Sequence, residues 1–319
     1  GTSSSYGGCA LVSDCMPRFG VHLILPSLAN VNRMAAAVAT GPVGSLRGTA
    51  AQGSDSSLSL RALFRVAATE HGQERSDLPL WALSPDVPAT LTFPRLLQGS
   101  DSPEVHRHDL PGVTGGFQLT NVLSKEECQS LVDVLDALGF HADAAVSLPY
   151  SFRHMVNCNL CVPDDVERLI FERCRHLLPE IAGCEPLGLN CKFRCYKYGS
   201  GDYFKPHTDG AWPGTRVEGE EVLMDAFGDR LSQLTFLILL SDDYEGGGTK
   251  FYDSSSGEVE TRTPLGGVLC FPHGYHPDSP MHEGMLVHSG YKYMIRTEVL
   301  YSLQALHRLR QSQRESSSL

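Results

Sequence analysis

The sequence predicts a mainly β protein with flanking helices, an α+β chain built around a double-sheet jelly roll. Short segments of strand character follow one another closely between residues 190 and 301, as in antiparallel jelly rolls. Two segments of helical periodicity precede them. The chain has 319 residues, of which 41% are hydrophobic, and can therefore bury one sizeable core.

The first predicted helix begins at Ser124-Lys-Glu-Glu127, which has the pattern of a capping box. Apolar residues repeat at helical spacing as far as Leu138, and Gly139 provides a stop. A second helix is expected over residues 164–178, where the apolar spacing recurs and Pro179 ends it. Both helices should pack against the strands that follow.

The strand segments are bounded by turn residues. We expect strands near residues 190–198, 203–209, 233–241, 248–252, 258–262, 267–271, 284–288 and 291–301. On the first of them Arg194, Tyr196 and Tyr198 share one face, while Phe193 and Cys195 lie on the other. The apolar run 234–240 is too short to span a bilayer and predicts a buried strand.

His207-Thr208-Asp209 is the most informative motif of the chain. In an extended strand residues i and i+2 lie on one face, about 7 Å apart, so the imidazole and the carboxylate can converge on one ion. A second imidazole, from His282, would give the set of two histidines and one carboxylate typical of non-haem Fe(II) oxygenases, which leaves coordination positions open. A structural zinc site would be closed by four protein ligands. Manganese or cobalt would fit the same three side chains.

Five stretches of the sequence resemble the Fe(II)/2-oxoglutarate-dependent dioxygenases, in the prolyl 4-hydroxylase-like branch. They are Tyr198–Asp209, Gln233–Asp242, Gly246–Phe251, Gly267–Phe271 and His282–Lys292. Their order and spacing match the family, and the resemblance covers about residues 112–302. It implies the double-stranded β-helix form of the jelly roll, with the iron inside its mouth.

The resemblance also implies roles for individual residues. His207, Asp209 and His282 would hold Fe(II), with 2-oxoglutarate and dioxygen as co-substrates and ascorbate as a reductant. Lys292, ten residues after the distal histidine, would bind the far carboxylate of 2-oxoglutarate. Arg296 is the alternative, because it lies on the same strand face and its fork suits a carboxylate. A tyrosine hydroxyl would contact the same molecule, from Tyr198 or, as second candidate, Tyr196.

The implied activity is hydroxylation of a C–H bond with release of succinate and CO₂. We expect a prolyl or other side chain of a peptide as substrate. A free amino acid or small molecule is the alternative, and a non-catalytic jelly-roll binding module is the third reading. Residues 147–159 and the acidic segment 210–230, which contains Trp212, are expected to form the loops that choose the substrate.

Several other residues imitate metal ligands. His288 lies where the family needs no ligand, and His273 and His276 lie in a Pro/Gly-rich turn, facing solvent or standing behind the ligands. The stretch His106-Arg-His-Asp109 has no third group at suitable spacing. The pairs Cys158/Cys161 and Cys191/Cys195 offer a zinc alternative, but their spacing is irregular and favours buried free thiols.

The formal charge of −11 argues against a broad basic surface for nucleic acid. No segment predicts a membrane span. Ten scattered cysteines favour a soluble protein of a reducing intracellular compartment, with organelle targeting or the secretory pathway as alternatives.

The sequence divides into three parts. Residues 1–105 form a low-complexity extension, either leader-like or partly docked; its first 53 residues hold a single acidic side chain, Asp14, and a short helix is expected near Leu58–Ala68. Residues 106–303 form the dioxygenase domain, and residues 304–319 a polar C-terminal tail.

Overall fold

The computed structural model describes residues 59–97, 104–145, 148–253 and 257–316. Within them a large sheet contains ten strands. In spatial order these are β1 (Phe64–Glu70), β2 (Leu78–Leu83), β6 (Val156–Cys161), β8 (Lys192–Tyr198), β19 (Lys292–Ser302), β12 (Arg230–Leu239), β16 (Val268–Pro272), β4 (Phe117–Thr120) and β3 (His106–Asp109), with β7 (Gly188–Leu189) beside β19.

A smaller sheet of five described strands faces the large one. Its order is β15 (Gly257–Thr261), β14 (Thr249–Asp253), β17 (Met281–Gly284), β9 (Tyr203–His207) and β5 (Arg153–His154). Two short ribbons complete the strands: β10 (Arg216–Glu218) with β11 (Glu221–Leu223), and β13 (Tyr244–Gly246) with β18 (Val287–Gly290). The chain passes from β8 to β9 to β12 to β14 to β16 to β17 to β19, and so alternates between the sheets. This is the predicted double-stranded β-helix.

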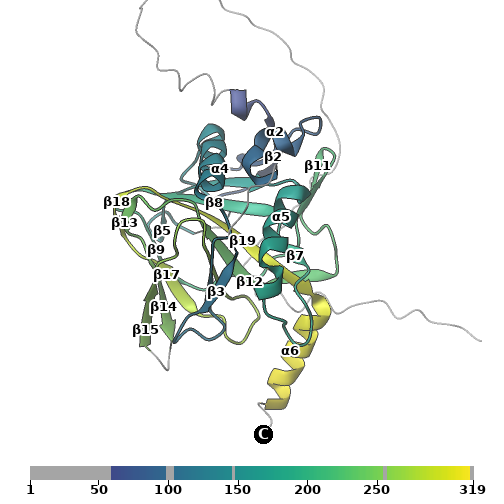
Figure 1. Ribbon diagram of the computed structural model, residues 1–319, viewed down its shortest axis with the longest axis vertical. Helices are drawn as coiled ribbons and strands as arrows, with labels where there is room; N and C mark the ends of the chain where they lie inside the picture. The colour runs from purple at the N-terminus through teal and green to yellow at the C-terminus, as the bar shows by residue number, and fades with distance from the viewer. Residues whose placement is uncertain (1–58, 98–103, 146–147, 254–256, 317–319) are drawn as a thin grey trace, which may run out of the picture. The chain divides into compact units, whose positions relative to one another are not determined.

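Helices brace the outer face of the large sheet, as Figure 1 shows for α4 and α5. The helices are α2 (Ala89–Thr92), α3 (Pro94–Leu97), α4 (Lys125–Leu138), α5 (Asp164–Cys174), the 3₁₀ turn η1 (Arg175–Leu177) and α6 (Leu303–Ser316). The capping box of α4 is confirmed: Glu127 N donates to Ser124 Oγ, and Ser124 N donates to Glu127 Oε2. Gly139 ends α4 at a φ of 86°.

The large sheet separates two apolar clusters. On β8, Phe193 and Cys195 join the cluster beneath the helices, whereas Tyr196 and Tyr198 join the cluster between the sheets. This is the expected alternation, and it places hydrocarbon on one face and polar groups on the face that lines the mouth.

The structure differs from the sequence expectations in several places. The strand expected near residues 284–288 is interrupted at residues 285–286, between β17 and β18. The helix expected near Leu58–Ala68 is present only over the described residues 59–61. Residues 64–70 form a strand instead, because they pair with β2, whose Leu78 and Leu80 are fully buried; tertiary pairing outweighs local helical preference. Residues 147–159 were expected to form a loop, but they contain strand β5 and the start of strand β6. The tail is helical over Leu303–Ser316 and buries Ala305 and Leu306. The leader-like bias of residues 1–53 lies outside the described residues.

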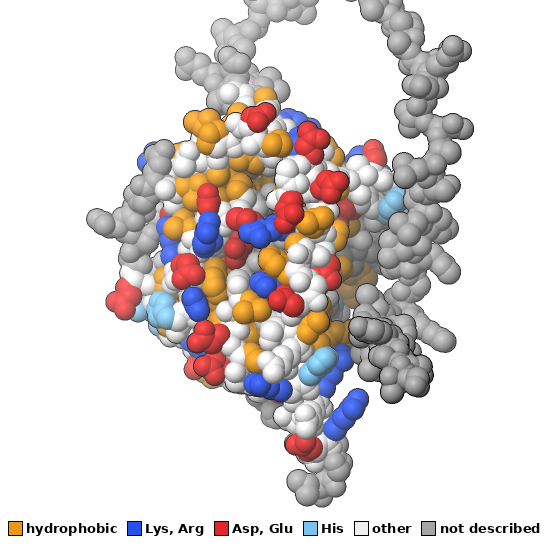
Figure 2. Space-filling view, turned by 90° about the vertical axis from the view of Figure 1, so that its right-hand side faces the viewer, with side chains coloured by type: hydrophobic (Ala, Val, Ile, Leu, Met, Phe, Trp, Pro, Cys, Tyr) orange, Lys and Arg blue, Asp and Glu red, His pale blue; other side chains and the backbone are white. Residues whose placement is uncertain are grey.

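No helix in the described part of the chain is long and apolar enough to cross a membrane. On the face shown in Figure 2, basic and acidic side chains are interspersed, so that face carries no broad basic surface.

We predict that Glu127→Ala lowers the free energy of unfolding by about 3–5 kcal/mol, because the change leaves a nearly buried guanidinium without its carboxylate. Glu127 is buried in α4 and accepts hydrogen bonds from Arg173 of α5 at 2.7 and 2.9 Å. Urea denaturation measures the loss. Glu126→Ala, which removes the same charge from the exposed neighbouring position, should have a much smaller effect; equal effects would contradict the role of the ion pair.

Candidate metal and co-substrate site

Three side chains meet at the mouth between the sheets. His207 ends β9 and is the register partner of His282 on β17, and Asp209 follows two residues after His207. One possible ligand atom from each residue lies within 4.8 Å of the other two. The structure therefore brings together the three residues that the sequence selected, and within the described residues they form the single cluster of this kind.

Backbone carbonyls orient the two imidazoles. His207 Nδ1 lies 2.8 Å from Lys205 O, and His282 Nδ1 lies 3.2 Å from Pro280 O. Nδ1 donates to a carbonyl, which assigns the proton to that nitrogen and leaves Nε2 with a lone pair for an ion. Burial, reinforced by the neighbouring His282, lowers the pKa of His207 to about 4, and burial also lowers the pKa of His282. Both rings are neutral at pH 7, as metal ligands must be.

Asp209 is held by two groups on the large sheet. Thr235 Oγ1 donates to Asp209 Oδ2 at 2.7 Å, and Arg296 Nε lies 3.3 Å from the same oxygen. Burial would raise the pKa of Asp209, but the charge of Arg296 holds that pKa well below its usual value. The carboxylate is therefore ionised and fixed in orientation.

A chain of hydrogen bonds runs behind Asp209. His273 is fully buried, with Nδ1 2.8 Å from Thr235 Oγ1 and Nε2 2.8 Å from Ser232 Oγ. Since the Thr235 hydroxyl donates to Asp209, His273 Nδ1 donates to Thr235 and its Nε2 accepts from Ser232. The backbone N–H of Trp212 in turn donates to Ser232 Oγ at 2.8 Å.

These hydrogen bonds were not predicted from the sequence. The sequence analysis expected His273 either to face solvent or to support the metal ligands from behind, and the structure shows the second arrangement. Its burial lowers the pKa of His273 to about 4, so the ring is neutral. Thr235 was the available signal, as a lone hydroxyl inside the apolar run of β12.

Lys292 is a buried cation that has no carboxylate partner among the described residues. Lys292 is 4% exposed, and its Nζ donates a hydrogen bond to Gly247 O at 2.6 Å. No ion pair joins it to any residue in the described ranges. Burial, reinforced by nearby Arg262, lowers the pKa of Lys292 to about 8. Gly247 has a φ of +64°, and a Cβ there would lie 2.9 Å from Val287 Cγ2, so this carbonyl contact requires glycine.

Arg296 is placed differently. Its guanidinium lies beside Asp209 and 3.6 Å from Glu298, and these carboxylates raise its pKa despite burial. Its Nε and Nη2 atoms nevertheless lack a well-formed hydrogen bond to any described group. Arg296 thus already has anionic neighbours, in contrast to Lys292.

One cavity contains all seven residues that the sequence assigned to the metal and to 2-oxoglutarate. We call it the metal cavity. Its lining includes His207, Asp209, His282, Lys292, Arg296, Tyr196 and Tyr198. Lys292 and Tyr198 are register partners on β19 and β8, and Nζ lies 5.4 Å from the centre of the tyrosine ring. Phe204 stacks on His207 with ring centres 3.6 Å apart. The residues fit a divalent ion with an acidic co-ligand: two free imidazole nitrogens, a fixed carboxylate and an uncompensated cation share one space.

The other candidate ligands lie elsewhere. His288 on β18 and the pair His106 and His108 on β3 are exposed, and His276 is outside the cluster. The four cysteines of the zinc alternative are buried, and burial raises the pKa of each thiol. They do not form a metal cluster among the described residues, and they pack as small apolar side chains.

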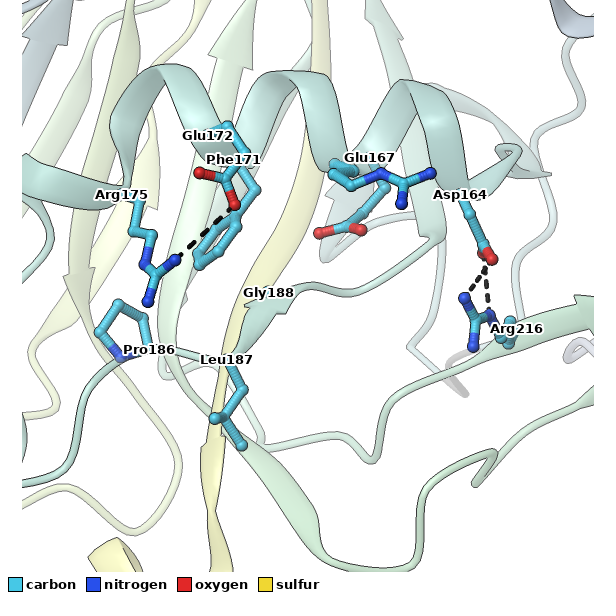
Figure 3. A pocket seen from close by; sticks show the side chains of 10 residues that line it. Asp164, Glu167, Phe171, Glu172, Arg175, Pro186, Leu187, Gly188 and Arg216 are labelled. Atoms are coloured by element: carbon cyan, nitrogen blue, oxygen red, sulfur yellow. Dashed lines mark hydrogen bonds and ion pairs between the residues drawn. The ribbon is translucent and has the colours of Figure 1, made fainter.

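A separate cavity lies against α5 (Figure 3), between that helix and residues 186–188. Glu167 stands between two ion pairs, Asp164 with Arg216 and Glu172 with Arg175. Glu167 Oε1 accepts a hydrogen bond from Leu189 N at 2.5 Å. Burial raises the pKa of this carboxyl to about 7. The cavity shares no lining residue with the metal cavity.

No protein-family model and no curated protein matches the sequence. Solved structures do match. A Pseudomonas putida prolyl-4-hydroxylase is 15% identical with a TM-score of 0.38, and the match covers 58% of this chain and 91% of that one. A viral collagen prolyl hydroxylase from Paramecium Bursaria Chlorella virus-1, in a 2-oxoglutarate complex, is 17% identical with a TM-score of 0.38, covering 63% and 97%.

A third match is a Trichoplax adhaerens prolyl hydroxylase in complex with a hypoxia inducible factor peptide fragment. It is 14% identical with a TM-score of 0.41, covering 68% of this chain and 91% of that one. In its motif order the chain resembles the prolyl 4-hydroxylase-like branch of the Fe(II)/2-oxoglutarate dioxygenases. At these low identities and TM-scores, the chemistry of the site has to be inferred from the side chains of the metal cavity.

We predict that Glu167→Gln stabilises the protein at pH 8.5 but not at pH 5. The folded-state pKa of about 7 lies above the usual 4.5, so the folded state keeps a proton that the unfolded state loses. Stability therefore falls as pH rises from 4.5 to 7, by about 1–3 kcal/mol, and glutamine avoids this cost while still accepting from Leu189 N. Thermal denaturation at the two pH values measures the difference. Glu172→Gln, on the exposed side of α5, is the control, and a gain for Glu167→Gln that does not change with pH would count against the assignment.

Proposed function

We propose that this protein is an Fe(II)- and 2-oxoglutarate-dependent dioxygenase that hydroxylates a substrate C–H bond. In the proposed reaction one oxygen atom enters the C–H bond and the other enters succinate, while 2-oxoglutarate loses CO₂. The observation that carries the proposal is the combination in one cavity of a two-histidine, one-carboxylate cluster and a buried lysine that has no described anionic partner.

His207 Nε2, His282 Nε2 and a carboxylate oxygen of Asp209 would hold the metal, since their remaining polar atoms are engaged by the protein. Bound Fe(II), with 2-oxoglutarate and dioxygen, supplies the oxidising chemistry. The side chains of the protein would orient the metal ligands and compensate their charge. Thr235 and Arg296 fix Asp209, and Phe204 covers one face of His207.

Lys292 is the proposed partner for the far carboxylate of 2-oxoglutarate. A buried ammonium is costly unless it is paired, and the described chain gives it only a carbonyl. Tyr198, beside it, is the proposed second donor, because its ring packs 5.4 Å from Lys292 Nζ. Arg296 is less suited, since Asp209 and Glu298 already lie against its guanidinium.

A peptidyl side chain, prolyl in the first instance, is the proposed substrate. A free amino acid or another small molecule is the second candidate, favoured by the buried Arg153 of the cavity that adjoins the metal cavity. Formation of succinate from 2-oxoglutarate with added Fe(II) and ascorbate tests the enzymatic proposal. A catalytically silent protein under these conditions would point to a binding module instead.

We predict that His207→Ala or Asp209→Ala lowers succinate formation and iron retention by more than about 100-fold, because each removes a ligand from a set of three. Iron content after desalting and succinate yield are the measurements. His288→Ala, which removes an exposed imidazole six residues beyond His282, is the matched control and should leave both values within twofold. Loss of iron in His288→Ala with retention in His282→Ala would overturn the ligand assignment.

We predict that Lys292→Ala raises the 2-oxoglutarate concentration needed for half-maximal turnover by about 100-fold, because it removes the counter-charge of a buried carboxylate. Iron retention should change far less. Arg296→Ala should show the opposite pattern, since Arg296 lies 3.3 Å from Asp209. The exposed Lys205→Ala on β9 is the control for loss of a lysine. A larger 2-oxoglutarate defect in Arg296→Ala than in Lys292→Ala would assign the co-substrate to the arginine.

A further inference from the structure

A second cavity adjoins the metal cavity, and we call it the Arg153 cavity. Tyr196 lines both, so the two spaces share a wall. Its floor is the inner face of β6 and β8, and Trp212 and Met224, from the segment that follows Asp209, also line it. Arg153, on β5, is the register partner of Phe204, the residue that stacks on His207. Arg153 therefore stands one strand away from the proposed metal ligands.

The charges of the Arg153 cavity do not balance. Three cations and one anion line it, whereas the whole chain has a net charge of −11. Lys192 pairs with Glu70, and Arg194 donates to Glu298 at 2.5 Å. Arg153 is 6% exposed, and no residue in the described ranges forms a hydrogen bond or an ion pair with its guanidinium. Of the charged residues that line this cavity, Arg153 is thus the one without a partner in the described part of the chain.

An arginine that is almost entirely withdrawn from bulk solvent and has no described partner is costly, and polar groups in such positions are almost always satisfied in native proteins. Arg153 is not available to bind 2-oxoglutarate, the ligand proposed for Lys292, because Arg153 does not line the metal cavity. It is nevertheless close enough for its charge to act on Tyr198, whose pKa is raised by burial and by Tyr196 while Arg153 opposes the rise. An anion bound by Arg153 would thus lie beside the proposed reaction centre.

The remaining wall of the Arg153 cavity is largely apolar, which suits the hydrocarbon part of a carboxylic acid. The Trp212 ring is held over the Arg194 guanidinium at 4.5 Å, and its indole Nε1 has no acceptor among the described residues. Met224 and Tyr196 add apolar surface. The planar fork of an arginine matches a carboxylate through two parallel hydrogen bonds.

We propose that the Arg153 cavity binds the substrate by a carboxylate that pairs with Arg153, so that the hydroxylated molecule is a carboxylic acid. The carboxylate belongs either to a free amino acid or related small acid, or to a peptide. The hydroxylation of the acid rests on the proposed function, whereas the binding of the acid to Arg153 does not.

The test compares acids with their amides. The probes are free L-amino acids and short N-acetylated proline peptides, each supplied as the acid and as the C-terminal amide. We expect at least one acid to raise the Tm of the protein by about 2–4 °C, and its amide to have no effect. The same acid should stimulate succinate formation at least tenfold more than its amide and yield a product heavier by one oxygen atom. Free acids and peptide acids are separate arms that identify the source of the carboxylate.

Arg153→Gln should abolish the acid-dependent rise in Tm and raise the KM for the acid at least tenfold, whereas Arg153→Lys should retain part of the preference. Without ligand, Arg153→Gln should not lower Tm, because it removes an unpaired buried charge; a large loss of Tm would reveal a structural role and overturn the proposal. Arg168→Gln, an exposed arginine of α5, is the control.

The two proposals fail in different ways. Absence of succinate from the wild-type protein would refute the dioxygenase while leaving the acid-dependent shift in Tm to decide on Arg153. Turnover with amides as effective as acids, an unchanged response in Arg153→Gln, or no shift in Tm with any acid would overturn the role of Arg153.

Discussion

Strand β19 is buried on both faces, and the charges that it carries on its inner face have to be compensated there. Ten of its eleven residues are buried. Because side chains alternate along a strand, Lys292, Arg296 and Glu298 point into the mouth while Tyr293 and Ile295 pack beneath the helices. Each inward charge needs a counter-charge within the same low-dielectric space. The arrangement of the site follows from this requirement.

The protein meets the requirement at two of the three positions. Glu298 receives Arg194 from β8, and Arg296 lies against Asp209, the carboxylate beside the two imidazoles. Within the described ranges, the partner of Lys292 is a backbone carbonyl, that of Gly247. The same comparison of charges distinguishes Arg153 on β5, the strand next to β9 at the edge of the small sheet. Among the described residues, Lys292 and Arg153 are therefore positive charges on the inner surface without an anionic partner, and for each of them we propose a ligand as the partner.

The sequence predicted those features that depend on neighbouring residues. His207 and Asp209 are only two residues apart, so their closeness could be predicted, although β9 ends at His207 and Asp209 lies after the strand rather than on it. The capping box of α4 likewise lies within four residues. Strand β1 could not be predicted, because Phe64–Glu70 become a strand only by pairing with β2 on a sheet built mostly from residues beyond 150. The link from Asp209 through Thr235 to His273 joins three distant segments and leaves no local pattern. The isolation of Arg153 is likewise invisible in a sequence, since the lack of a partner is a property of the folded chain.

The hydrogen bonds behind Asp209 begin at the backbone of Trp212, whose side chain lines the neighbouring cavity. One residue thus contributes its indole to the wall against which a substrate would rest and its amide to the support of the carboxylate. The placement of Trp212 and the aim of Asp209 are consequently tied mechanically through Ser232, His273 and Thr235. This link constrains evolution or engineering of the 210–230 segment for a new substrate. Residues of that segment can change only if the backbone N–H of Trp212 still donates to Ser232.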